Sequence, residues 1–78
     1  MKIKHIASNA EFQAIKFDGT EKNFNLIKRV LSGFNVISFF CNGSFYYDEN
    51  SVESGEYFIF NADWYSTVKN LSEFEVVA

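Results

Sequence analysis

Nucleophilic catalysis would need an activated side chain, and this chain offers one pair of residues for it. A thiol beside an imidazole is a common arrangement, because the imidazole takes the proton and leaves the reactive thiolate. The sequence contains a single histidine, His5, and a single cysteine, Cys41. His5 is expected in a mobile N-terminal strand and Cys41 borders an Asn-Gly turn, so nothing in the sequence places the two side chains together. We therefore expect the protein not to be an enzyme.

Metal and phosphate sites have little support from the residue types. A zinc site needs about four His, Cys or carboxylate ligands, and one histidine plus one cysteine falls short. The run Asp48-Glu49-Asn50 lacks the Asp-x-Asp-x-Asp-Gly spacing of a calcium loop. No glycine-rich phosphate loop occurs in the sequence. Paired carboxylates for glycoside hydrolysis stay open, although a sheet of this size leaves little room for a cleft. The sequence predicts no bound metal or cofactor.

Aromatic and acidic residues are concentrated in the last third of the chain. Residues 53–75, ESGEYFIFNADWYSTVKNLSEFE, contain six aromatic residues, five acids and one cation. Aromatic side chains rimmed by carboxylates are typical of a protein-binding surface. The alternative is a core with a charged loop that keeps a β-rich protein soluble. Five acids with no intervening cation lie between Phe45 and Trp64: Asp48, Glu49, Glu53, Glu56 and Asp63.

Nucleic-acid binding is disfavoured by where the cations lie. Stacking rings are abundant, as in proteins that bind single strands. However, residues 38–78 contain only one cation, Lys69. Phosphate contacts dominate such affinity, so an acidic aromatic face would repel a nucleic acid. Lys22, Lys28 and Arg29 form a basic set too small to bind nucleic acid alone, and we expect no direct nucleic-acid partner.

The charge is divided unevenly along the chain. Residues 1–29 hold six of the seven cations and three acids, so their net charge is +3. Residues 30–78 hold seven acids and one cation, so their net charge is −6. Such asymmetry can mark an interaction face. It can also mean that two oppositely charged parts attract each other across the fold through individually weak surface pairs.

The size of the chain predicts one domain, residues 1–78. A chain of 78 residues buries roughly 60% of its unfolded surface. The fifteen aromatic residues enlarge its core, because each ring can bury about 150–250 Å². One cysteine allows no internal disulfide, and no apolar run reaches the roughly 18 residues of a membrane span. The N-terminal segment has no apolar core of a signal peptide. We therefore expect a location in the cytoplasm, with no membrane partner.

A strand and a helix are predicted in the first half. Residues 11–17 (EFQAIKF) read as a strand with apolar residues on both faces. Thr20 is a suitable N-cap for a helix over residues 21–32, with Gly33 at the C′ position. Lys28 and Arg29 fall near the helix end, where cations are favoured. Phe24, Ile27 and Leu31 form one apolar stripe, and we expect it to be buried.

The second half is predicted to be β-structure. Asn42-Gly43 is a strong hairpin signal between strands at 36–40 and 45–47, because a type I′ turn needs positive φ at both residues. Residues 48–55 read as a polar loop anchored by Val52. Further strands are expected at 56–60, 64–68 and 74–77. The fold class is α+β: one helix packed on a mostly antiparallel sheet of five or six strands, in the order β-α-β-β-β-β-β. Because one helix covers only part of such a sheet, some rings on its other face are curled into a core or exposed.

The sequence also resembles a group of small phage and prophage proteins of uncharacterised function. The opening FQAIKFDGTEKNFNLIKRVL is similar to their strand, which ends in an aromatic residue and Gly and is followed by an Asn-led helix. Residues 54–57 (Ser-Gly-Glu-Tyr), 63–65 (Asp-Trp-Tyr) and 73–75 (Glu-Phe-Glu) resemble three later pieces of that pattern, in order. The resemblance covers about residues 11–77, although the prolines common in the family are missing. It implies a phage-encoded protein in the host cytoplasm, and it supplies no catalytic residues.

These observations lead to a functional hypothesis and an alternative. We expect a small phage-encoded protein-binding module that inhibits or redirects a host protein with a basic surface. A defence nuclease complex is a candidate target, as for an anti-CRISPR protein, and the module itself would be a monomer or homodimer. The alternative is a structural or virion-associated homo-oligomer that buries the same rings between subunits. The partner-binding set comprises the five acids Asp48, Glu49, Glu53, Glu56 and Asp63 and the aromatic anchors Tyr46, Tyr47, Tyr57, Trp64 and Tyr65.

Overall fold

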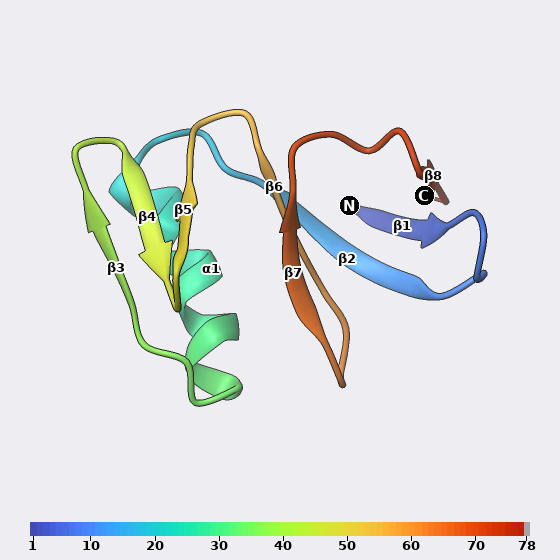
Figure 1. Cartoon of the computed structure of the whole chain (residues 1–78), viewed down its shortest axis with the longest axis horizontal. Helices are drawn as coiled ribbons and strands as arrows, with labels where there is room; N and C mark the ends of the chain where they lie inside the picture. Colours follow the sequence, from blue (N-terminus) through green and yellow to red (C-terminus); the bar gives the residue numbers. More distant parts are fainter. Residues whose placement is uncertain (78) are drawn as a thin grey trace.

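A computed structural model describes residues 1–77 and shows an α+β fold (Figure 1). One helix is accompanied by strands that pair antiparallel wherever a pairing is defined. The elements in chain order are β1 (Lys2–His5), β2 (Glu11–Lys16), α1 (Glu21–Gly33), β3 (Ser38–Cys41), β4 (Ser44–Tyr47), β5 (Asn50–Val52), β6 (Tyr57–Phe60), β7 (Tyr65–Val68) and β8 (Phe74–Val76).

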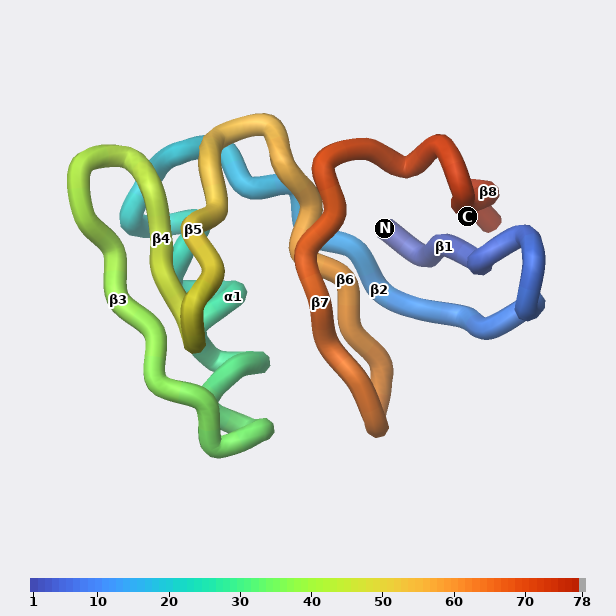
Figure 2. The backbone as a smooth tube through the Cα atoms, viewed as in Figure 1, coloured from blue at the N-terminus to red at the C-terminus, as the bar shows by residue number. Residues whose placement is uncertain are grey.

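The strands form two sheets, where the sequence predicted one. The larger sheet has five strands in the order β7-β6-β2-β1-β8, and the smaller has three in the order β3-β4-β5. Figure 2 shows the backbone passing from one sheet to the other through the connection between β5 and β6. Helix α1 lies beside the smaller sheet and away from β1 and β8 (Figure 1). The predicted α+β class, with one helix and a mostly antiparallel sheet, is confirmed. The predicted single sheet and the chain order β-α-β-β-β-β-β differ from the observed two sheets and the order β-β-α-β-β-β-β-β-β of the described residues.

Two strands are absent from the predicted order of elements, for different reasons. Strand β1 contains three polar residues and a single aliphatic one, Ile3, so no periodicity marks it. It nevertheless lies between β2 and β8, where Ile3 pairs with Phe12 on one side and Val76 on the other. Strand β5 falls inside the predicted polar loop and ends at Val52, which is fully buried and pairs with Phe45. Both strands are specified by the strands they pair with rather than by the pattern of their own residues.

The start of α1 follows local signals. The Thr20 side chain accepts a hydrogen bond from the Asn23 backbone N–H at 3.1 Å, and Glu21 lies in the first turn, where a negative charge suits the helix dipole. These features confirm the predicted N-cap. The last turn contains no basic residue, because Lys28 and Arg29 lie before it. The expected favourable contribution of these two cations to the helix end is therefore not found.

The end of α1 is a Schellman motif built on asparagine. Asn35 adopts a φ of 62°, its N–H donates to the Ser32 carbonyl at 2.9 Å, and the Val36 N–H donates to the Leu31 carbonyl at 2.9 Å. Gly33, predicted at C′, is instead the last helical residue. Asn35 takes the left-handed position because its short polar side chain tolerates that conformation.

The Asn42-Gly43 hairpin forms as predicted. The two turn residues have φ values of 51° and 81°, and they connect Cys41 and Ser44, which are paired. A second tight turn at Asp48-Glu49 joins β4 to β5, and Asp48 has a φ of 51°. The three strands of the smaller sheet are therefore joined by two successive tight turns.

The core consists of two clusters on opposite faces of the larger sheet. The first joins the predicted helical stripe to the smaller sheet and to one face of β6, and its buried residues are Phe17, Phe24, Ile27, Leu31, Phe45, Tyr47, Val52 and Phe58. The second is formed on the other face by Ile3, Ala14 and Ile59. Phe58 and Ile59 are neighbours on β6, so alternation along one strand supplies both clusters. Within residues 1–77, α1 is too short to span a bilayer.

Candidate functional site

The ten predicted partner-binding residues do not share one face of the molecule. Four of them, Tyr47, Asp48, Trp64 and Tyr65, line a depression between the β4–β5 turn and β7, with a volume of about 380 Å³. Asn50, Ser66 and Thr67, which the sequence did not single out, complete its lining. We call this depression the Asp48–Tyr65 site.

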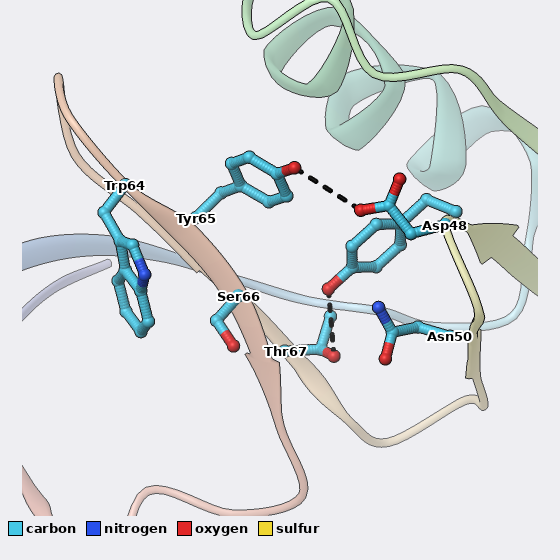
Figure 3. Close-up of a pocket in the computed structure, with 7 residues that line it drawn as sticks. Asp48, Asn50, Trp64, Tyr65, Ser66 and Thr67 are labelled. Carbon is cyan, nitrogen blue, oxygen red and sulfur yellow. Dashed lines mark hydrogen bonds between the residues drawn. The ribbon is translucent and has the colours of Figure 1, made fainter.

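The side chains of the Asp48–Tyr65 site come from both sheets (Figure 3). The Tyr65 hydroxyl points toward Asp48 and donates to its Oδ2 at a long distance of 3.5 Å. The Tyr65 ring packs against Phe34, with 4.8 Å between ring centroids. Burial and the nearby Asp48 carboxylate raise the pKa of Tyr65 above its usual value. The phenol therefore stays protonated near neutral pH and remains a hydrogen-bond donor.

Tyr47 forms the inner wall of the site rather than a free anchor. Its side chain is only 4% exposed and belongs to the first core cluster. Its hydroxyl lies 3.2 Å from Thr67 Oγ1. Burial raises the pKa of Tyr47, although the bond to Thr67 lowers it in part. Because its ring is enclosed by the fold, Tyr47 positions the site and offers almost no surface to a partner.

Two of the predicted acids close a turn. The Glu56 Oε1 atom accepts a hydrogen bond from the Glu53 backbone N–H at 2.9 Å, and the Glu56 N–H donates to the Glu53 carbonyl at 3.1 Å. The Glu56 carbonyl also accepts from the Phe17 N–H at 2.8 Å, which joins this turn to the end of β2. Glu56 therefore has a structural role, while the Glu53 side chain is exposed.

The remaining acids lie in exposed turns. Glu49 follows Asp48 in the β4–β5 turn, and Asp63 lies in the turn between β6 and β7. The Asn61 side chain shapes the latter turn by accepting from the Asp63 and Trp64 N–H groups, both at 2.9 Å. Glu49 and Asp63 are free to contact a partner, although neither lines the depression.

Trp64 and Tyr57 belong to the other face of the larger sheet. Trp64 is 49% exposed, and its ring lies 5.4 Å from that of Phe12. Phe12 in turn contacts Phe74 at 6.3 Å. Tyr57 is half-buried, and the Lys16 Nζ atom lies 5.8 Å from its ring centroid. The edge residue Trp64 thus borders both the Asp48–Tyr65 site and this aromatic face.

Tyr46 lies apart from the other candidates. It pairs with Phe39 across β3 and β4, and the two rings stack with 5.0 Å between centroids. Phe39 is 58% exposed, and the Tyr46–Phe39 pair lies on the face of the smaller sheet that is turned away from the first core cluster. Tyr46 is therefore separated from the Asp48–Tyr65 site by the smaller sheet, and a partner bound at that site would not contact Tyr46 across it.

The acidic residues of the second half are not neutralised by the cations of the first. Within residues 1–77 the one ion pair joins Lys2 Nζ to Glu11 Oε1 at 3.2 Å, and both residues belong to the first 29. In the described chain, no ion pair therefore joins the basic residues 1–29 to the acidic residues after them. The carboxylates near the Asp48–Tyr65 site face solvent instead.

The geometry gives no support to catalysis by His5 and Cys41. His5 lies on β1 of the larger sheet, where its Nδ1 is 2.9 Å from Ser8 Oγ, while Cys41 is exposed on β3 of the smaller sheet (Figure 1). In the described part of the chain, no group of three or more His, Cys, Asp and Glu side chains is placed to hold a metal ion.

Comparison of the chain with protein-family models, curated proteins and solved structures gives no match. The function of this chain is therefore inferred from the geometry of the site. Sequence reasoning selected Asp48 and Tyr65 by residue type, and it missed Asn50 because β5 was read as a loop. Alternation along residues 64–68 puts Thr67 on the Tyr65 side, so that residue was recoverable from the strand period.

Proposed function

We propose that this protein is a non-catalytic, phage-encoded module that binds a basic surface of a host protein at the Asp48–Tyr65 site. A defence nuclease complex remains a candidate target, in keeping with the sequence resemblance described above. The observation that carries the proposal is an exposed carboxylate, Asp48, held beside aromatic side chains with no cation within ion-pair distance in residues 1–77.

The unpaired carboxylate defines the charge of the partner. Asp48 and Glu49 are both exposed at the tip of the β4–β5 turn, and the nearest hydrogen-bonding partner of Asp48 is a neutral phenol. An incoming lysine or arginine could form a charge-assisted hydrogen bond with Asp48, which is stronger than a bond between neutral groups. A phosphate backbone would be repelled, so the site favours a basic protein over a nucleic acid.

The aromatic side chains define how the partner is held. Tyr65 is fixed by Phe34 on one side and Asp48 on the other, so little side-chain entropy would be lost on binding. Trp64 presents a half-exposed ring at the rim. Tyrosine and tryptophan are common hot-spot residues, and a guanidinium can stack on their rings.

The test is affinity capture from a host-cell lysate with wild-type protein and two matched variants. Asp48→Asn with Glu49→Gln removes the site charge of Asp48 and the neighbouring charge of Glu49 in the same turn, and asparagine suits the positive φ of position 48. Glu73→Gln with Glu75→Gln removes two exposed charges elsewhere. We expect the wild type and the second variant to retain a basic partner that the first variant loses.

Binding kinetics of the captured protein then identify the mechanism. Charges at an interface rim act mainly on the association rate and its salt dependence. The site variant should therefore associate more slowly, and added salt should slow it less than it slows the wild type. Equal capture and equal salt dependence for all three proteins would contradict the proposal.

A further inference from the structure

Strand β3 is an exposed edge without the usual protection against pairing. The two sheets end in four edge strands: β3, β5, β7 and β8. Natural edges are commonly protected by charges, prolines or bulges. Glu49 and Glu53 flank β5, Lys69 follows β7 and Glu75 lies within β8, whereas residues 30–47 contain no charge and no proline. Of the four edges, β3 is the one that another strand can approach without meeting a charge.

The side chains of this edge are apolar as well as uncharged. Ile37 is 88% exposed and Phe39 is 58% exposed, and Phe39 stacks on Tyr46 of the neighbouring strand. The β3 edge thus combines exposed apolar area with an absence of charged side chains.

We propose that β3 pairs antiparallel with β3 of a second copy, which joins the two smaller sheets across a two-fold axis. A second copy fits because antiparallel pairing of β3 with itself can set apolar Phe39 against apolar Phe39 and brings no charge to the contact from residues 30–47 of either chain. An isologous contact also closes after two subunits. The surface differs from the Asp48–Tyr65 site, so the dimer goes beyond the proposed function and is independent of it.

The hairpin geometry determines which backbone groups of β3 are free for this pairing. Cys41 and Ser44 close a two-residue turn, so they form a hydrogen-bonded pair. Hydrogen-bonded and non-hydrogen-bonded pairs alternate along an antiparallel ladder, so the backbone groups of Ser38 and Phe40 point away from β4. If Ser38 of one copy bonds to Phe40 of the other, the two Phe39 residues lie directly opposite each other.

Two measurements test the dimer. Light scattering over a range of concentrations should give twice the chain mass of 9.0 kDa for the wild type and a single chain mass for Phe39→Lys. Ile37→Lys provides a second disrupting variant, and Val76→Lys is the control because Val76 is 61% exposed on a different edge. A wild type that stays monomeric, or a Phe39→Lys variant that still dimerises, would overturn the proposal, as would open-ended assembly.

Crosslinking tests the register. Opposed residues in a non-hydrogen-bonded pair have Cα atoms about 4.5 Å apart, which is within the range for a disulfide. In a Cys41→Ser background, Phe39→Cys should therefore form a disulfide-linked dimer under mild oxidation, whereas Val76→Cys should not. Equal crosslinking of both variants, or of neither, would contradict the proposed pairing.

Discussion

At the scale of single residues, Tyr47 and Tyr65 show how the same residue type takes two roles within one site. Tyr47 has its ring in the core and its hydroxyl near Thr67, whereas Tyr65 directs its hydroxyl toward the exposed Asp48. Substitution of Tyr47 therefore reports on stability, and substitution of the Asp48–Tyr65 pair reports on binding. The two effects can be separated experimentally because the residues touch different partners.

The raised pKa of Tyr47 predicts a loss of stability at alkaline pH. Below the unfolded-state pKa of about 10, the contribution of the neutral Tyr47 phenol to stability is complete. As pH rises, the phenol of the unfolded state loses its proton first, and stability falls until the folded-state pKa is passed. Tyr47→Phe has no hydroxyl at this position and cannot show this loss. Between about pH 8 and pH 10.5 its urea midpoint should therefore fall less than that of the wild type. Equal falls would show that Tyr47 does not contribute, since Tyr65 and the lysines are common to both proteins.

At the scale of elements, positive φ explains why one glycine is required and another is not. Gly43 has a φ of 81° in the β3–β4 turn, whereas Gly33 is helical and an added Cβ there would meet nothing within 4 Å. Gly43→Val should lower the free energy of unfolding by about 1–3 kcal/mol through backbone strain. Gly33→Ala should raise it by about 0.5–1 kcal/mol. Urea unfolding measures both, and a neutral Gly43→Val would contradict the assigned turn.

Elements with local signals were predictable from the sequence, and strands whose own residues carry no clear pattern were not, because pairing with other strands defines them. The N-cap of α1, its buried stripe and the Asn42-Gly43 turn are all encoded within a few residues. Strand β1 is defined by pairing with β2 and β8, and β5 by pairing with β4. The same holds for the Asp48–Tyr65 site. The sequence indicated its residue types, but it did not indicate that the two sheets bring them into contact.

At the scale of the whole molecule, the two core clusters are coupled through shared strands. Phe58 and Ile59 on β6 face opposite clusters, and β2 similarly directs Ile15 to the first cluster and Ala14 to the second. If either cluster unfolds, the shared strands lose their order and the hydrogen bonds to their neighbours break. The other cluster then loses the strands that support it. The described chain should therefore unfold as one cooperative unit, in agreement with the single domain predicted from its length.

Phe24→Ala tests this coupling from a distance. Phe24 lies in the first cluster and is 3% exposed, so its truncation should cost about 3–5 kcal/mol, out of roughly 4–12 kcal/mol for a domain of this length. Trp64 packs on Phe12 beside the second cluster and provides a fluorescence signal from there. In a cooperative molecule, Phe24→Ala lowers the urea midpoint seen by Trp64 fluorescence as much as the midpoint seen by far-ultraviolet circular dichroism. Leu26→Ala is the control, because Leu26 is on the same helix but 50% exposed, and both of its midpoints should stay near the wild-type value. A Trp64 transition that keeps its wild-type midpoint in Phe24→Ala, while the circular dichroism transition moves, would mean that the two clusters unfold separately.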